Sequence, residues 1–178
     1  MEHLCPFPET IVVKEIKKKH SQAQYIERSN RIEFSRKECS RLDPEYLRYV
    51  VYHEIGHWFR WNHVGWHEID GRRYGEGFLI LDCTDPEEGF ADGFAAHFIE
   101  PDTLAKKHPR HDVMLNNMIS ENEERIRDFC EQVVRWLSHQ LELGEHDLLL
   151  ERGVLGHLHC GGAAHQPEDL PRQCHLHG

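Results

Sequence analysis

The feature that most constrains this chain is a pair of histidines four residues apart within a predicted helix. Asp43-Pro44-Glu45 predicts where the helix begins, because an acidic N-cap, a proline in the first turn and a further acid all favour a helix N-terminus. An apolar pattern then continues to about Trp61. It consists of Leu47, Val50, Val51, Ile55 and Trp58. Residues four apart share one face of a helix, so His53 and His57 are predicted to point in the same direction.

Glu54 follows the first of these histidines and completes the pattern His-Glu-x-x-His. Two imidazole nitrogens on one helix face can bind a Zn²⁺ ion at about 2.0–2.1 Å. Zinc lowers the pKa of a bound water to about 7, and a neighbouring carboxylate can then take its proton. The pattern is typical of zinc peptidases. It predicts His53 and His57 as zinc ligands, Glu54 as general base, and peptide-bond hydrolysis as the reaction.

A catalytic zinc site needs a third protein ligand, and Glu88 is the favoured candidate. It follows a second predicted helix start at Thr84-Asp85-Pro86 and has Asp92 four residues later; Pro101 closes this helix. One carboxylate can bind the metal while the other accepts a hydrogen bond from a ligand histidine. Alternatively, the acids at this position only favour the positive end of the helix dipole.

His63 is a rival third ligand, because some small zinc peptidases carry a histidine six residues after the second histidine of the motif. Metzincins also place a histidine there, but they need a glycine where this chain has Arg60. Glycine allows the chain to leave the helix sharply, so Glu88 is favoured over His63. His67 is a weaker candidate still.

Residues 87–101 resemble the second helix of ImmA/IrrE-type metallopeptidases, which reads roughly E-x-x-A-[ND]-x-F-A-x-x-L-L-x-P. Together with the His-Glu-x-x-His helix, the resemblance covers about residues 43–101. It implies His53, His57 and Glu88 as zinc ligands, Glu54 as general base and Asp92 as a support. Toxin-type zinc peptidases of the anthrax lethal factor kind have a similar ligand helix.

The same resemblance implies a gluzincin-type fold. In such a fold a short mixed sheet packs on the two active-site helices, and an extended substrate adds to a sheet edge by β-augmentation. The strand near Ile32–Phe34 is the expected edge. Glu100 departs from the family, since an apolar residue is usual before the closing proline, and no helix-turn-helix segment is visible.

The remaining chain contains further predicted elements. Pro8–His20 is predicted to be a short helix, and Gln24–Arg28 and Arg31–Ser35 are predicted strands. The glycine-rich segment after Asn62 ends in a strand-like run at residues 78–81. Ser120 with Glu123 forms a capping box that should open a long amphipathic helix ending before Gly144.

These elements predict an α+β fold with a long C-terminal helix, and the resemblance implies that residues 1–150 form a minimal zincin-like domain. Residues 151–178 form a His/Cys-rich tail. Its potential ligands are His157, His159, Cys160, His165, Cys174, His175 and His177. Such residues could hold a second, structural Zn²⁺, although the usual Cys-x-x-Cys pairs are absent. The alternative is a disordered tail that binds metal adventitiously.

Three residues are candidate donors to the negative charge that develops on the scissile carbonyl oxygen. They are Tyr74 in the glycine-rich segment, and His108 and His111 after the second helix. Residues of these types are more often ordinary surface residues than catalytic ones. Cys5, an isolated cysteine, is a weak candidate for an inhibitory thiolate on the zinc.

Composition limits the partners. The formal net charge of −10 argues against nucleic-acid binding, and no apolar run is long enough to span a membrane. The first residues lack the pattern of a signal peptide, so we expect a cytoplasmic protein whose six cysteines are mostly reduced. The expected partner is a protein or peptide substrate bound as an extended strand.

Three functions remain open. The first is a cytoplasmic zinc endopeptidase that cuts an extended segment of another protein. The second is a non-catalytic zinc-binding module that regulates or binds a partner, and the third is a hydrolase of a non-protein substrate. The presence of Glu54 favours catalysis, because a purely structural zinc site needs no base beside its ligands.

Overall fold

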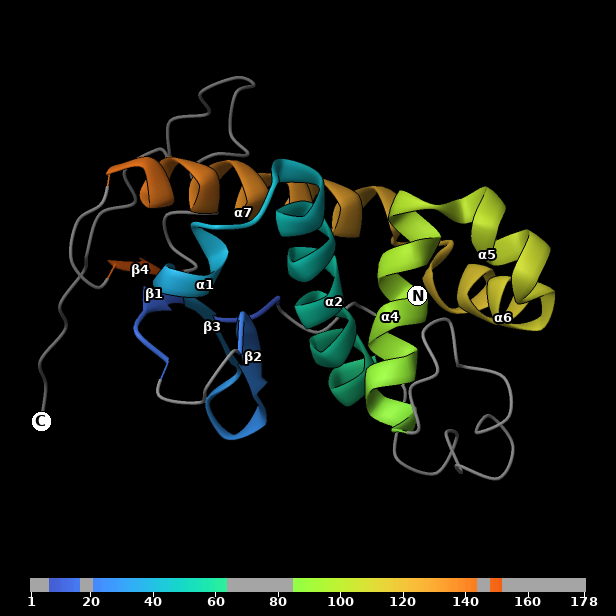
Figure 1. Cartoon of the computed structure of the whole chain (residues 1–178). Coiled ribbons are helices and arrows are strands. Elements are labelled where there is room, and N and C mark those ends of the chain that lie inside the picture. The colour runs from blue at the N-terminus through green and yellow to red at the C-terminus, as the bar shows by residue number, and fades with distance from the viewer. Residues whose placement is uncertain (1–6, 17–20, 64–84, 144–147, 152–178) are drawn as a thin grey trace, which may run out of the picture.

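The computed structural model describes residues 7–16, 21–63, 85–143 and 148–151, and it has an α+β fold (Figure 1). The strands are β1 (Thr10–Lys14), β2 (Ala23–Ile26), β3 (Arg31–Ser35) and β4 (Leu148–Glu151). The helices are α1 (Arg36–Cys39), α2 (Pro44–His63), α4 (Pro86–Ile99), α5 (Pro101–Lys107), α6 (Pro109–Ile119) and α7 (Glu123–Leu143). In Figure 1 the sheet lies on the left, α5 and α6 on the right, and α2 and α4 between them, with α7 along the top.

The four strands form a mixed sheet in the order β2-β3-β1-β4. β1 pairs parallel with β3, while β2 is antiparallel to β3 and β4 is antiparallel to β1. The predicted helix over Pro8–His20 is therefore wrong where β1 lies. Ile11 and Val13 are fully buried and their neighbours only partly, which is the two-residue period of a strand. The β-branched residues and the pairing with β3 outweigh the helix start that Pro8 suggested.

β3 is an interior strand, so the predicted substrate edge near Ile32–Phe34 is also wrong. β3 matches the predicted strand at Arg31–Ser35, but it lies between β2 and β1. The edge strand close to α2 is β2, followed by a short 3-10 helix at Glu27–Ser29. Asn30 then closes the hairpin in the left-handed conformation, with φ of 41°.

Both motif-bearing helices form where their capping residues predict. The Asp43 carboxylate accepts a hydrogen bond from the Tyr46 backbone N–H at 3.0 Å at the start of α2. The Asp85 carboxylate accepts one from the Glu87 N–H at 2.8 Å at the start of α4. α4 ends at Ile99, and Pro101 opens the next helix, as expected for a residue that cannot continue the preceding one.

α2 and α4 pack closely because Gly56 has no side chain. A Cβ at this position would lie 3.0 Å from the Ala91 Cα, 3.1 Å from the Phe94 Cβ and 3.2 Å from the Ala91 carbonyl oxygen. These atoms belong to backbone or to the base of a side chain, so they cannot move aside without shifting a helix. The glycine therefore sets the distance between the two helices that carry the candidate site.

Gly56→Ala is expected to destabilise the fold despite the better helix propensity of alanine. Overpacking costs about 1–3 kcal/mol, and the propensity gain of about 1 kcal/mol offsets part of it. The expected net loss is about 1 kcal/mol, and Gly56→Val should cost more because its side chain is larger. Urea denaturation of the metal-free proteins measures this loss. Equal or higher stability of Gly56→Ala would contradict the close packing described here.

The predicted long C-terminal helix is confirmed as α7, but it does not begin at Ser120. Ser120 instead ends α6, where its N–H donates to the Asn116 carbonyl, and α7 starts at Glu123. The buried residues of α7 form one stripe, and Leu141 at its end is only partly buried. The stripe comprises Ile126, Phe129, Cys130, Val133 and Leu137.

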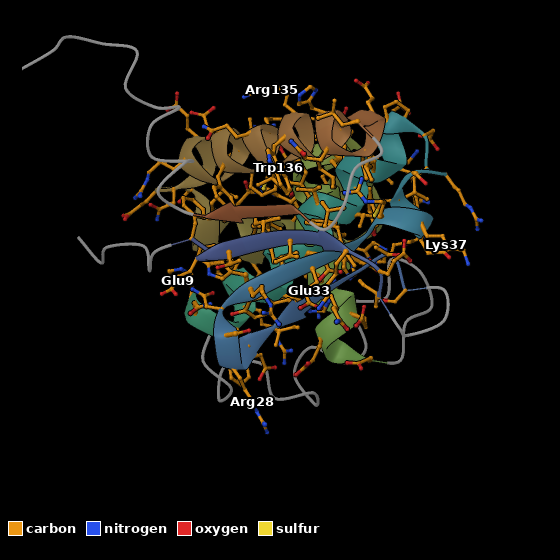
Figure 2. All side chains as sticks on the ribbon, turned by 90° about the vertical axis from the view of Figure 1, so that its left-hand side faces the viewer. Glu9, Arg28, Glu33, Lys37, Arg135 and Trp136 are labelled. Atoms are coloured by element: carbon orange, nitrogen blue, oxygen red, sulfur yellow. The ribbon has the colours of Figure 1, made fainter. Side chains whose placement is uncertain are left out.

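Glu33 is a buried carboxylate in the middle of the sheet (Figure 2). Lys14 and Arg31 each pair with it at 2.7 Å, and the Gln24 side-chain amide donates to it at 2.8 Å. Burial raises the pKa of Glu33, but the bonds from Lys14 and Gln24 outweigh this effect and lower it. The cluster links β1, β2 and β3.

None of the described helices is long and apolar enough to cross a membrane.

Candidate metal centre

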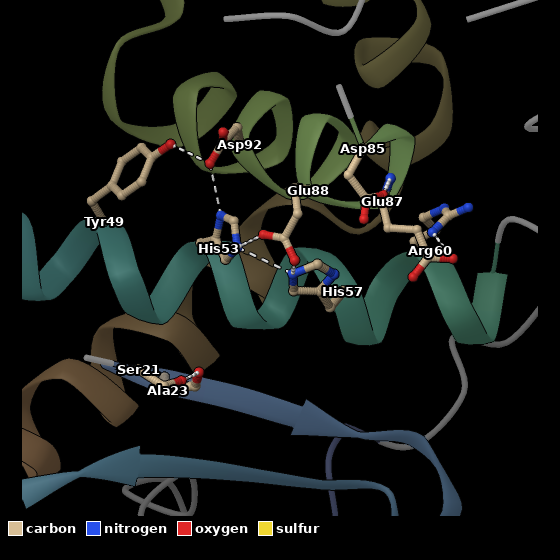
Figure 3. A network of polar contacts seen from close by, with 10 residues as sticks. All are labelled: Ser21, Ala23, Tyr49, His53, His57, Arg60, Asp85, Glu87, Glu88 and Asp92. Atoms are coloured by element: carbon tan, nitrogen blue, oxygen red, sulfur yellow. Dashed lines mark hydrogen bonds and ion pairs between the residues drawn. The ribbon is translucent and has the colours of Figure 1, made fainter. Parts of the chain in front are cut away.

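Three predicted ligands converge between α2 and α4 (Figure 3). His53 and His57 project from one face of α2, and Glu88 projects toward them from the first turn of α4. The two histidine Nε2 atoms are 3.1 Å apart. The Glu88 carboxylate lies 3.2 Å from the Nε2 of His53 and 3.6 Å from that of His57. The structure thus brings Glu88 to the histidine pair, as predicted.

The donor set fits a zinc ion. Two atoms that each bind a tetrahedral ion at about 2.0–2.1 Å lie about 3.3–3.4 Å from each other. The two histidine nitrogens, 3.1 Å apart, lie close to this value, and each faces a different Glu88 oxygen, Oε2 at 3.2 Å from His53 and Oε1 at 3.6 Å from His57. Two imidazoles and one carboxylate also form a ligand set typical of catalytic zinc, since they leave one position for water.

Asp92 orients the first histidine. Its Oδ1 lies 2.8 Å from the Nδ1 of His53, on the side of the ring away from Glu88. In the neutral ring, donation from Nδ1–H to the carboxylate leaves the Nε2 lone pair facing His57 and Glu88. The structure therefore places Asp92 where a carboxylate supports a metal-binding histidine.

The site has the electrostatic character of a cation site. Burial lowers the pKa of His53, but hydrogen bonds to Asp92 and Glu88 outweigh it and raise the pKa to about 9. Hydrogen bonds with His53 and His57 hold the pKa of Glu88 well below its usual range. Carboxylates that stabilise a positive charge on an imidazole also favour a divalent cation in its place.

Glu54 is buried beside the three ligands, with 6% of its surface exposed. Its Oε2 has no hydrogen-bond partner among the described residues. Burial raises the pKa of Glu54, while the charges of His57 and His53 and a hydrogen bond from the Tyr25 backbone oppose the rise. Glu54 thus links α2 to edge strand β2, and its second carboxylate oxygen is buried without a partner among the described residues.

The ligands open onto a cleft of about 470 Å³. Residues 21–25 and Glu27, from β2 and its flanks, line one side of this cleft. α2 and the start of α4 line the other, including all three ligands, Glu54 and Asp92. At one end Arg60 pairs with Glu87 at 2.8 Å. A chain lying along β2 would therefore pass in front of His53, Glu54 and His57.

His63 does not join the three ligands. α2 continues to His63, and six residues further along a helix correspond to a rotation of about 240°, so its side chain leaves the face of His57. The His63 ring instead packs 5.3 Å from Trp58 and 4.9 Å from Phe59. His67, Tyr74, Cys5 and the tail from residue 152 lie outside the described residues.

The two other candidate oxyanion donors are remote from the cleft. His108 precedes α6 and His111 lies in its first turn, and neither lines the cleft. Their rings stack on each other, with centroids 5.8 Å apart. Burial and the charge of His108 lower the pKa of His111 to about 4.

His111 should make the fold sensitive to acid. Because the pKa of His111 is lowered to about 4, its ring stays neutral in the folded protein at pH values where the unfolded chain binds a proton, which is below about pH 6.5. Its contribution to stability is complete above that pH and is lost as the pH falls toward 4, by up to about 1.4 kcal/mol per pH unit. Urea denaturation at pH 7 and pH 5 should therefore show a smaller loss for His111→Gln than for wild type. Equal losses would contradict this role.

Sequence reasoning missed Tyr49, whose hydroxyl donates to Asp92 Oδ1 at 2.7 Å. Tyr49 lies one helical turn before His53, so its spacing from the histidine pair was the available indication. The Arg60–Glu87 ion pair between α2 and α4 was missed as well, because no spacing rule connects residues on different helices.

Comparisons with family models, with curated proteins and with solved structures find no match to this chain.

Proposed function

We propose that this protein is a zinc-dependent peptidase that cuts a protein or peptide bound as an extended strand. One observation carries the proposal: a buried carboxylate with a free oxygen, Glu54, lies beside a two-histidine, one-glutamate donor set at an open cleft. The proposal includes a gluzincin-type arrangement of the two helices and kinship with ImmA/IrrE-type metallopeptidases, which rest on the motifs at residues 53–57 and 87–101.

His53, His57 and Glu88 would hold the zinc ion in this mechanism. When bound, zinc lowers the pKa of a water molecule and polarises the carbonyl of the peptide bond. Glu54 would accept the proton of the attacking water and then deliver it to the leaving amine. Burial raises the pKa of Glu54, which makes its carboxylate a stronger base toward this proton.

Strand β2 supports an extended substrate. Within the described residues, β2 is the end strand of the sheet on the cleft side, so its outer edge can pair with a substrate backbone. The Tyr25 backbone already bonds Glu54. A substrate strand along β2 would therefore place a peptide bond close to the base and to the ligands.

A non-catalytic zinc module is the alternative function. It would use the same three ligands but would give no role to Glu54. Burying a carboxylate with an oxygen that lacks a partner costs free energy, and a structural site gains nothing in return. We therefore favour catalysis.

Cleavage of a peptide library, followed by mass spectrometry, tests the proposal. The zinc-loaded protein should generate new peptide termini, a chelator should stop cleavage, and added Zn²⁺ should restore it. A protein that binds zinc through these ligands but leaves the library intact would support the non-catalytic module instead.

A further inference from the structure

We infer that Tyr49 is a positioning residue that controls the zinc affinity of this site through Asp92 and His53. The inference rests on the proposed function for its zinc ion, but it concerns a residue that neither motif contains. It arises from a chain of two hydrogen bonds that ends at a proposed ligand (Figure 3).

Both hydrogen bonds end on the same carboxylate oxygen. Asp92 Oδ1 is 2.7 Å from the Tyr49 hydroxyl and 2.8 Å from the Nδ1 of His53. The hydroxyl can only donate to a carboxylate, so the direction of this bond is fixed. Asp92 is 7% exposed, which makes the bonds within the protein important for its orientation. Tyr49 thus orients the Asp92 oxygen, which in turn orients the His53 ring.

The packing of two helices holds the residues of this hydrogen-bond series close together. Tyr49 and His53 are one turn apart on α2, and Asp92 reaches both from α4. The Tyr49 ring is fixed in turn by stacking on Tyr46, with centroids 5.9 Å apart and planes inclined by 8°. Without the hydroxyl, Asp92 would keep its bond to His53 but lose the second anchor that selects its rotamer. The His53 ring would then reach the ligand geometry less often.

Zinc affinity in full-length Tyr49→Phe tests the role directly. Loss of an orienting group commonly costs 10- to 100-fold in metal affinity, and Tyr49 acts one bond further away, so we expect a loss of about three- to tenfold. Chelator competition measures the affinity. Zinc bound by the His53→Ala/His57→Ala double variant is subtracted, which removes any contribution of the tail.

Tyr52→Phe is the matched control. Tyr52 lies on the same helix, and its hydroxyl also donates to a carboxylate, that of Glu131 at 2.8 Å, but away from the cleft. Both variants lose one such bond and should lose similar stability. Only Tyr49→Phe should weaken zinc binding. Equal zinc affinities in the two variants would overturn the inference.

Asp92→Ala separates a relay from a local packing effect. If Tyr49 acts through Asp92, Tyr49→Phe has no further effect on zinc affinity in the Asp92→Ala background, whereas additive losses would overturn the relay. These results are distinguishable from a failure of the proposed function. If wild type binds zinc at His53 and His57 and cleaves peptides but Tyr49→Phe matches it, only the inference on Tyr49 fails.

Discussion

Glu54→Gln is expected to lower the rate of peptide hydrolysis by about 10²- to 10⁴-fold while the zinc content stays unchanged. Glutamine has nearly the shape of glutamate and can still accept the hydrogen bond from the Tyr25 backbone, but it cannot take a proton from water. Because Glu54 is not one of the three converging donors, its replacement leaves the ligand set intact.

The measurement is the cleavage rate of a peptide identified in the library, made with equal amounts of zinc-loaded proteins. Glu45→Gln provides the control, because Glu45 is an exposed glutamate of the same helix outside the cleft. It should cleave at the wild-type rate. If Glu54→Gln also cleaved at that rate, Glu54 would not be the general base, and the observed cleavage would need another source.

Replacing a ligand should weaken zinc binding much more than replacing a nearby histidine. His53→Ala, His57→Ala and Glu88→Ala each remove one of three converging donors, so we expect losses of at least about 100-fold in zinc affinity. His63→Ala should stay within about twofold of wild type. The His63 ring packs on Trp58 and Phe59 and points away from the other donors.

The same chelator competition, corrected for the tail in the same way, measures these affinities. Urea denaturation of each metal-free variant shows whether a loss of zinc binding comes from unfolding of the protein. If Glu88→Ala bound zinc like wild type while His63→Ala did not, the assignment of the third ligand would be wrong.

The local parts of this architecture could be predicted because short-range chemistry fixes them. The Asp43 and Asp85 caps define where α2 and α4 begin, and four-residue spacing fixes the shared face of His53 and His57. The approach of Glu88 to the histidines followed from two motifs in the right order. Gly56 lies between the two histidines of the motif and allows the close approach of α4.

The parts that sequence reasoning missed depend on distant partners. β1 is a strand because it pairs with β3, which no pattern within Pro8–His20 reveals. The order of the strands makes β2 the edge of the sheet, although β3 has the clearer alternation of apolar residues. Tyr49 became visible only when α4 brought Asp92 within reach of its hydroxyl.

Zinc-edge anomalous diffraction from crystals of the zinc-loaded protein shows directly whether His53, His57 and Glu88 bind the metal. We expect an anomalous peak within about 2.0–2.2 Å of the His53 and His57 Nε2 atoms and of one Glu88 oxygen, with Glu54 beside it but not bound. A map with no peak between α2 and α4, and zinc bound only elsewhere in the chain, would contradict this assignment.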